Sequence, residues 1–191
     1  NTNQPDCICS GANPIIVAGV GVGTLDGFIA LNGADYITFD GIDLMENPAN
    51  TTTTTQMEIG YALLKVDGTN GSQNNTIKNC SITLNKTNPS TVGIYAANHT
   101  TTSTTGLTVT AISGTNSNNK FYNNSIQNSY SGIYVLGFAD ATPYVYYDNG
   151  NDVGSLGGNT VRNFGGGATT TYGIYTTYQD SLAVSNNNVG G

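Results

Sequence analysis

The chain has 191 residues, enough for one domain with an apolar core, and only 9% of them are charged. Its net charge is −7 and it has five basic residues, which argues against nucleic acid as a partner because phosphates are neutralised by clustered cations. Apolar runs stay far below the ~20 residues of a membrane span, so no membrane span is expected.

Threonine, asparagine and glycine dominate the composition, with 28, 26 and 25 residues, about two-fifths of the chain. The 12 tyrosines lie with isoleucine and valine in short alternating runs. Disordered chains are poor in such residues. The pattern favours many short strands joined by turns.

Residues 1–26 are interpreted as an entry segment or a first partial coil. They contain Cys7 and Cys9, whose spacing does not match a structural zinc site. A disulfide involving either residue is one expectation for an oxidising compartment, and idle or buried thiols, including Cys80, are the alternative.

A glycine followed by an apolar strand recurs five times, at residues 27, 60, 93, 132 and 173. The intervals are 33, 33, 39 and 41 residues. Such periods indicate a repeat architecture. The inward positions predicted from this motif are Phe28, Tyr61, Ile94, Ile133 and Ile174.

A second motif, apolar-x-Asn-x-x-apolar, alternates with the first and occurs at residues 77–82, 121–126 and 184–189. Residues 161–163 are a partial copy, and residues 37–42 keep the apolar positions. The expected inward column is Ile37, Ile77, Phe121, Val161 and Val184. Together the motifs predict an all-β, right-handed parallel β-helix of about five coils with loop insertions, spanning residues 27–191.

Asparagines that recur in one column can hydrogen-bond from coil to coil and tolerate a left-handed corner. The predicted structural ladder consists of Asn79, Asn123, Asn163 and Asn186.

The chain ends just after a repeat strand, and solenoids need capped ends. We therefore expect further β-helix coils of a longer parent protein, or a partner chain, at the uncapped ends.

The stretches 34–44, 74–84, 118–135 and 158–175 resemble parallel β-helix repeats of large secreted Bacteroidota proteins. Residues 33–42 are similar to an opening coil of such proteins, many of which look like type IX secretion cargo. The resemblance implies an extracellular or cell-surface location. It implies little about function, because this architecture carries lyases, hydrolases, adhesins and ice-binding proteins.

Three residues of one expected outward column, Lys78, Tyr122 and Arg162, form the first candidate ligand-binding site. An aromatic ring between two cations can stack on a sugar while the cations hold a carboxylate. An ordinary solvated sheet face is the alternative interpretation.

A second outward column, Tyr95, Tyr134 and Tyr175, could receive a glycan or a partner protein. Stacked aromatic residues also stabilise sheets by roughly 0.2–1 kcal/mol per pair. The sequence leaves both roles open.

The only metal candidate is Asp148, Gly150 and Asp152, where oxygen ligands alternate around a glycine. The arrangement partly resembles a calcium loop but lacks its distal glutamate, so a polar turn is the alternative and no other cofactor is expected. His99 is the single histidine and is expected to be exposed, which leaves a nucleophile without an obvious base.

These observations favour a non-catalytic surface module over an enzyme: an adhesin, a stalk or a matrix segment that binds a polysaccharide or another surface protein. A polysaccharide lyase that uses Lys78, Tyr122 and Arg162 is the alternative. Ice binding ranks third, because the threonines concentrate in runs such as 51–55 rather than in columns.

Overall fold

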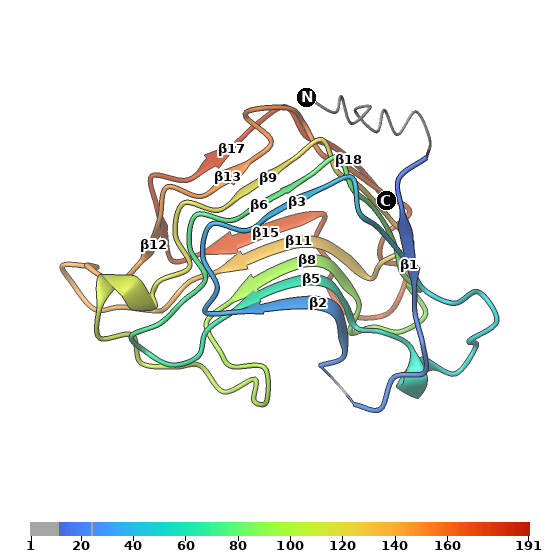
Figure 1. The fold of residues 1–191 in the computed structure, drawn as a ribbon, viewed down its shortest axis with the longest axis horizontal. Helices are drawn as coiled ribbons and strands as arrows, with labels where there is room; N and C mark the ends of the chain where they lie inside the picture. The colour runs from blue at the N-terminus through green and yellow to red at the C-terminus, as the bar shows by residue number, and fades with distance from the viewer. Residues whose placement is uncertain (1–11, 24) are drawn as a thin grey trace, which may run out of the picture.

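The computed structural model describes residues 12–23 and 25–191, and these residues form a parallel β-helix (Figure 1). Each coil passes in turn through three parallel sheets, so strands from distant parts of the chain lie side by side. The predicted all-β solenoid of about five coils is confirmed. Within the described part of the chain, no helix is long and apolar enough to cross a membrane.

The three sheets are numbered here in the order in which a coil visits them. Sheet 1 contains β2 (Gly27–Asn32), β5 (Ile59–Leu64), β8 (Val92–Ala97), β11 (Ser131–Leu136) and β15 (Ile174–Thr177). Sheet 2 contains β3 (Thr38–Asp40), β6 (Thr76–Lys78), β9 (Lys120–Tyr122), β13 (Asp152–Val153) and β17 (Ala183–Val184). Sheet 3 contains β1 (Ile15–Val17), β4 (Asp43–Met45), β7 (Ser81–Thr83), β10 (Ser125–Gln127), β14 (Thr160–Arg162) and β18 (Asn188–Gly190).

The short pair β12 (Asp148–Asn149) and β16 (Gln179–Asp180) lies between sheets 1 and 2 in the last two coils. Two single 3-10 turns, η1 (Thr53–Thr55) and η2 (Ile112–Gly114), lie in the longer excursions.

The core is built from apolar columns in which one residue of each coil stacks on its equivalent. Sheet 1 supplies Ile29, Tyr61, Ile94, Ile133 and Ile174. Sheet 2 supplies Phe39, Ile77, Phe121, Val153 and Val184. Sheet 3 supplies Ile16, Leu44, Ile82, Ile126, Val161 and Val189. The central members are fully buried, and burial of each such side chain stabilises the fold by about 1.5–3 kcal/mol.

Three column assignments expected from the sequence are wrong, although Val161 is buried in the core and Phe28 packs against it. Ile29 rather than Phe28, and Phe39 rather than Ile37, occupy the first coil's positions in sheets 1 and 2. Val153 rather than Val161 continues the sheet 2 column. The last error arose because residues 126–128 and 161–163 of sheet 3 repeat the apolar-x-Asn pattern of residues 77–79 and 121–123 of sheet 2.

The recurring glycine lies at the start of each sheet 1 strand, directly after the turn from sheet 3. A Cβ on Gly60 would lie 2.4 Å from the carbonyl oxygen of Gly93 and 2.7 Å from Cγ2 of Ile82. The equivalent Gly132 would place its Cβ 2.2 Å from the carbonyl oxygen of Gly173. Close stacking of the coils therefore excludes any side chain at these positions.

Asparagines form two ladders along the coil corners, and all of them are buried except the half-buried Asn187 of the last coil. The ladders contain Asn75, Asn119 and Asn151 between sheets 1 and 2, and Asn124, Asn159 and Asn187 between sheets 2 and 3. The backbone N–H of Asn75 donates to Oδ1 of Asn119 at 3.0 Å, while Nδ2 of Asn119 donates to the carbonyl of Ser72 at 2.9 Å. Each carboxamide thus satisfies one backbone donor and one backbone acceptor of the preceding coil.

The predicted ladder of Asn79, Asn123, Asn163 and Asn186 is wrong in register. All four residues have the left-handed backbone expected of a corner, with φ of 57°, 56°, 51° and 61°. Asn123 and Asn186, however, directly precede the ladder residues, and Asn163 contacts Asn128 at a different corner. Within an Asn-Asn dipeptide, the first residue turns the chain and the second bonds to the neighbouring coil.

Candidate functional site

The site expected at Lys78, Tyr122 and Arg162 does not assemble. Lys78 and Tyr122 are cross-strand neighbours on sheet 2, and the ammonium lies 6.0 Å from the ring centroid. Arg162 lies on sheet 3, paired in register with Gln127 and Gly190. The placement of all three residues in one column is therefore corrected: the second cation faces a different side of the molecule.

Lys78 is also occupied by a carboxylate. Its Nζ lies 3.1 Å from Oδ2 of Asp40, and the hydrogen bond and charge of Asp40 raise the pKa of Lys78. Asp40 in turn accepts a hydrogen bond from Nδ2 of Asn79. The cation that was expected to hold a ligand carboxylate already holds one from its own chain.

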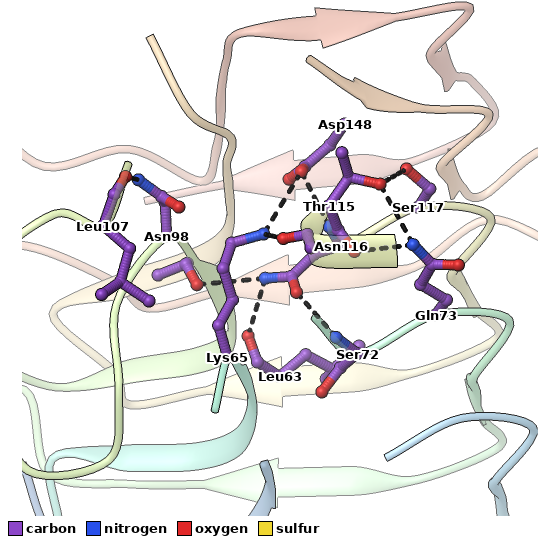
Figure 2. A network of polar contacts seen from close by, with 12 residues as sticks. Leu63, Lys65, Ser72, Gln73, Asn98, Leu107, Thr115, Asn116, Ser117 and Asp148 are labelled. Atoms are coloured by element: carbon purple, nitrogen blue, oxygen red, sulfur yellow. Dashed lines mark hydrogen bonds and ion pairs between the residues drawn. The ribbon is translucent and has the colours of Figure 1, made fainter. Parts of the chain in front are cut away.

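The two aspartates of the expected calcium loop contact different partners and do not face a common site. Asp148 is fully buried and faces Lys65, with 3.7 Å between Nζ and Oδ1 (Figure 2). Asp152 instead accepts hydrogen bonds from the backbone N–H and the hydroxyl of Ser155. Gly150 between them has a left-handed φ of 67°. Among the described residues, no three His, Cys, Asp or Glu side chains gather in a metal-binding group.

Asp148 and Lys65 belong to a buried polar network at the corner between sheets 1 and 2 (Figure 2). Nζ of Lys65 donates to the carbonyl of Gly114 at 2.5 Å, and the backbone N–H of Asn116 donates to Oδ1 of Asp148 at 2.8 Å. Burial raises the pKa of Asp148 and lowers the pKa of Lys65. The attraction between the two charges acts in the opposite direction on each pKa but has the smaller effect. The network joins three coils and serves the fold.

The predicted tyrosine column is in register on the outward side of sheet 1. Tyr134 pairs with Tyr95 and with Tyr175 in the neighbouring strands, with ring centroids 6.4 and 5.4 Å apart. Tyr172 adds a fourth ring, stacked on Tyr175 at 4.5 Å with an interplanar angle of 16°. These four residues are called the tyrosine stripe. Tyr172 directly precedes a repeat glycine, a signal that sequence reasoning missed.

Neighbouring polar groups orient the hydroxyl groups of two residues of the stripe, Tyr95 and Tyr134. Nε2 of His99 lies 3.0 Å from the hydroxyl of Tyr95, and Nδ1 lies 2.7 Å from the carbonyl of Thr100. Because a carbonyl only accepts, Nδ1 carries a proton, and in a neutral imidazole Nε2 then accepts from the hydroxyl of Tyr95. His99 is only 4% exposed, so the expectation of an exposed histidine is wrong.

Burial raises the pKa of both Tyr95 and Tyr134, which keeps their hydroxyls protonated. The hydroxyl of Tyr134 lies 2.8 Å from Oγ of Ser131. Tyr95 and Tyr134 therefore contribute neutral rings whose hydroxyl groups are held in place, which is chemistry suited to stacking and hydrogen bonding.

A pocket of about 300 Å³ lies beside the stripe. Its walls come from five successive coils and consist of Leu25, Glu58, Ile59, Pro89, Ser90, Val92, Tyr95, Tyr130, Ser131, Tyr134, Thr169 and Thr170. Apolar and aromatic surface with a few hydroxyl groups is the usual composition of a small-molecule site.

Glu58 is the only charged residue in the pocket wall, and the structure commits its carboxylate to the wall itself. Oε2 accepts the backbone N–H of Asp26 and Oε1 accepts Nδ2 of Asn88, both at 3.0 Å. Burial raises its pKa. The side chain ties two loops together, a role that only the tertiary structure reveals.

Cys80 is buried and has no disulfide partner among the described residues. The disulfide expected at Cys7 or Cys9 lies outside the described residues.

No family model, no curated protein and no solved structure matches the chain.

Proposed function

We propose that the protein is a non-catalytic, extracellular β-helix module of a bacterial surface protein, and that it binds a glycan along the tyrosine stripe. The observation that carries the proposal is the in-register placement of Tyr95, Tyr134 and Tyr175 on three successive coils. Sugar rings present C–H faces that stack on aromatic rings, while their hydroxyl groups hydrogen-bond at the edges.

The pocket beside the stripe supports a glycan over a purely apolar partner. Ser90, Ser131 and Thr169, which each carry a hydroxyl group, line it together with three tyrosines. A sugar could therefore pair its hydroxyl groups while it buries its ring, which avoids the cost of unsatisfied polar groups.

The experiment is calorimetric titration of the full chain with a panel of soluble polysaccharides. Tyr134→Ala should weaken binding by about tenfold, because an aromatic contact is worth about 0.5–1.5 kcal/mol beyond its buried area. Tyr122→Ala is the matched control, since Tyr122 projects from sheet 2. Equal losses for both variants, or no binding to any polymer, would contradict the proposal.

A polysaccharide lyase is the alternative function, and the same polymers test it. Its expected residues Lys78, Tyr122 and Arg162 divide between sheets 2 and 3, which is why we favour the non-catalytic function. Appearance of unsaturated sugar ends during incubation with the protein would establish the lyase instead.

Ice binding is not carried further, because it requires flat columns of threonine. The outward neighbours of the described coils are mixed, as in the series Asp40, Lys78 and Tyr122.

A further inference from the structure

A second hollow, of about 510 Å³, adjoins the pocket beside the stripe. It is lined by Lys86, Thr87, Pro89, Tyr130, Gly165, Gly166, Gly167, Ala168 and Thr169. Pro89, Tyr130 and Thr169 line both cavities, so a ligand of two or more sugar units could reach from one to the other.

Lys86 supplies a cation to this second hollow. Its Nζ donates to Oδ1 of Asn163 at 2.6 Å, which is a neutral partner. The ion pairs found in the part of the chain that the structure describes are Lys65–Asp148 and Lys78–Asp40, so no carboxylate there neutralises Lys86. An ammonium has three N–H donors, and the bond to Asn163 uses one of them.

The glycine loop 165–167 brings backbone donors to the same hollow. Gly165 and Gly166 have φ of 71° and 103°, and a Cβ on Gly166 would lie 4.0 Å from Nζ of Lys86. The N–H of Gly165 donates to the carbonyls of Ser129 and Tyr130. No acceptor within the described residues takes the N–H of Gly166 or Gly167. Successive free amides in such turns favour anions.

We propose that Lys86 and the glycine loop 165–167 form an anion subsite, so that the bound glycan carries an acidic group: a uronate carboxylate or a sulfate ester. Charge-assisted hydrogen bonds from an ammonium and from backbone amides are the strongest means of holding such a group. The neighbouring pocket contains the carboxylate of Glu58, which assigns the neutral part of the ligand to the stripe and its acidic part to Lys86. This inference rests on the proposed glycan binding.

The test compares matched polymers by calorimetric titration of the full chain. The pairs are polygalacturonate with its carboxyl-reduced form, and a sulfated galactan with its desulfated form. The acidic member of one pair should bind more tightly and lose affinity with added salt. The pair that discriminates identifies carboxylate or sulfate as the group recognised.

Lys86→Gln should weaken binding of the acidic polymer by about tenfold or more and leave the neutral form unchanged, since hydrogen bonds to charged groups contribute about 1.5–3 kcal/mol. Lys86→Arg should retain most of the binding. Folding of both variants is checked by their unfolding midpoints, which should match wild type because Lys86 makes a single exposed hydrogen bond.

Equal affinity for acidic and neutral polymers, unchanged in Lys86→Gln, would overturn the anion subsite and leave the tyrosine stripe standing. Loss in Lys86→Gln without loss in Tyr134→Ala would overturn the stripe and support the subsite. Absence of binding to all four polymers would overturn both.

Discussion

Two lysine–aspartate pairs in the part of the chain that the structure describes lie in opposite environments. Lys65 and Asp148 lie inside the corner between sheets 1 and 2, with both side chains fully buried. Lys78 and Asp40 lie on the outward face of sheet 2, with side chains 26% and 51% exposed. The nitrogen–oxygen distance is shorter in the exposed pair, at 3.1 Å against 3.7 Å in the buried pair. The distance alone therefore does not say how much each pair contributes to stability.

The pKa values of the two aspartates shift in opposite directions because their surroundings differ. The hydrogen bond from Asn79, followed by that from Lys78, lowers the pKa of Asp40. Loss of water raises the pKa of Asp148, because the attraction of Lys65 does not offset desolvation. Lys65 and Asp148, with the groups they contact, connect three coils. In the exposed pair, Asp40 binds the ammonium of Lys78, which would otherwise be free to bind a ligand.

The largest effect should follow removal of one member of the buried pair. Lys65→Met leaves Asp148 without its cation in the interior and should lower the free energy of unfolding by about 3–5 kcal/mol. Urea denaturation measures the loss. The double variant Lys65→Met/Asp148→Leu should recover most of the stability, and a double variant as unstable as the single one would show that charge burial is not the cause.

The next effect concerns the asparagine ladder. Asn119→Ala removes the acceptor of the Asn75 N–H and the donor to the Ser72 carbonyl, and should cost about 1–3 kcal/mol for each buried group left unpaired. Asn118→Gly is the control, because Asn118 has a φ of 58° that glycine adopts freely. Equal unfolding midpoints for the two variants would argue against the ladder.

A smaller effect is the separation of the two carboxyl titrations. Carbon-13 NMR of the side-chain carboxyls should place the Asp40 pKa below its ordinary value of 3.8 and the Asp148 pKa above it.

Ionised Asp40 therefore stabilises the fold above its ordinary pKa, and this contribution is lost as the pH falls through its lower folded pKa. Asp148 acts in the opposite sense: its ionisation costs stability as the pH rises through the interval between its ordinary and folded pKa values. Coincident titrations would remove the distinction between the pairs.

The smallest effect should come from the exposed pair. Lys78→Ala breaks the contact with Asp40, and exposed ion pairs contribute little because solvent screens them. No resolvable change in the thermal unfolding midpoint is expected at low or high salt. A clear loss of stability would show that the Lys78–Asp40 pair contributes to the stability of sheet 2.

The sequence predicted the fold but only part of the register. Alternating glycine and asparagine motifs indicated stacked coils, and the column of Tyr95, Tyr134 and Tyr175 was read correctly. Arg162 was assigned to the wrong sheet because sheets 2 and 3 carry the same apolar-x-Asn pattern. In three of the coils only two residues separate the sheet 2 strand from the sheet 3 strand, and such short neighbouring strands differ too little in sequence to be told apart.

The rest of the candidate site could not be read from the sequence. Glu58, Tyr130 and Thr169 come from three coils and meet only because the corner loops fold toward one another. Lys86 and the glycine loop 165–167 are almost eighty residues apart in the chain. His99 was expected in water, yet the excursion after β8 buries it against Tyr95.

The sequence by itself determined a repeating coil with apolar columns, glycine corners and an outward row of tyrosines, because these features follow from the two-residue period of a strand and the steric limits of a corner. The tertiary structure decided which column each residue joins, which charges lose their water and which loops enclose a pocket. Those outcomes depend on the number of residues each coil inserts at its corners, and the inserted segments carry no periodicity of their own.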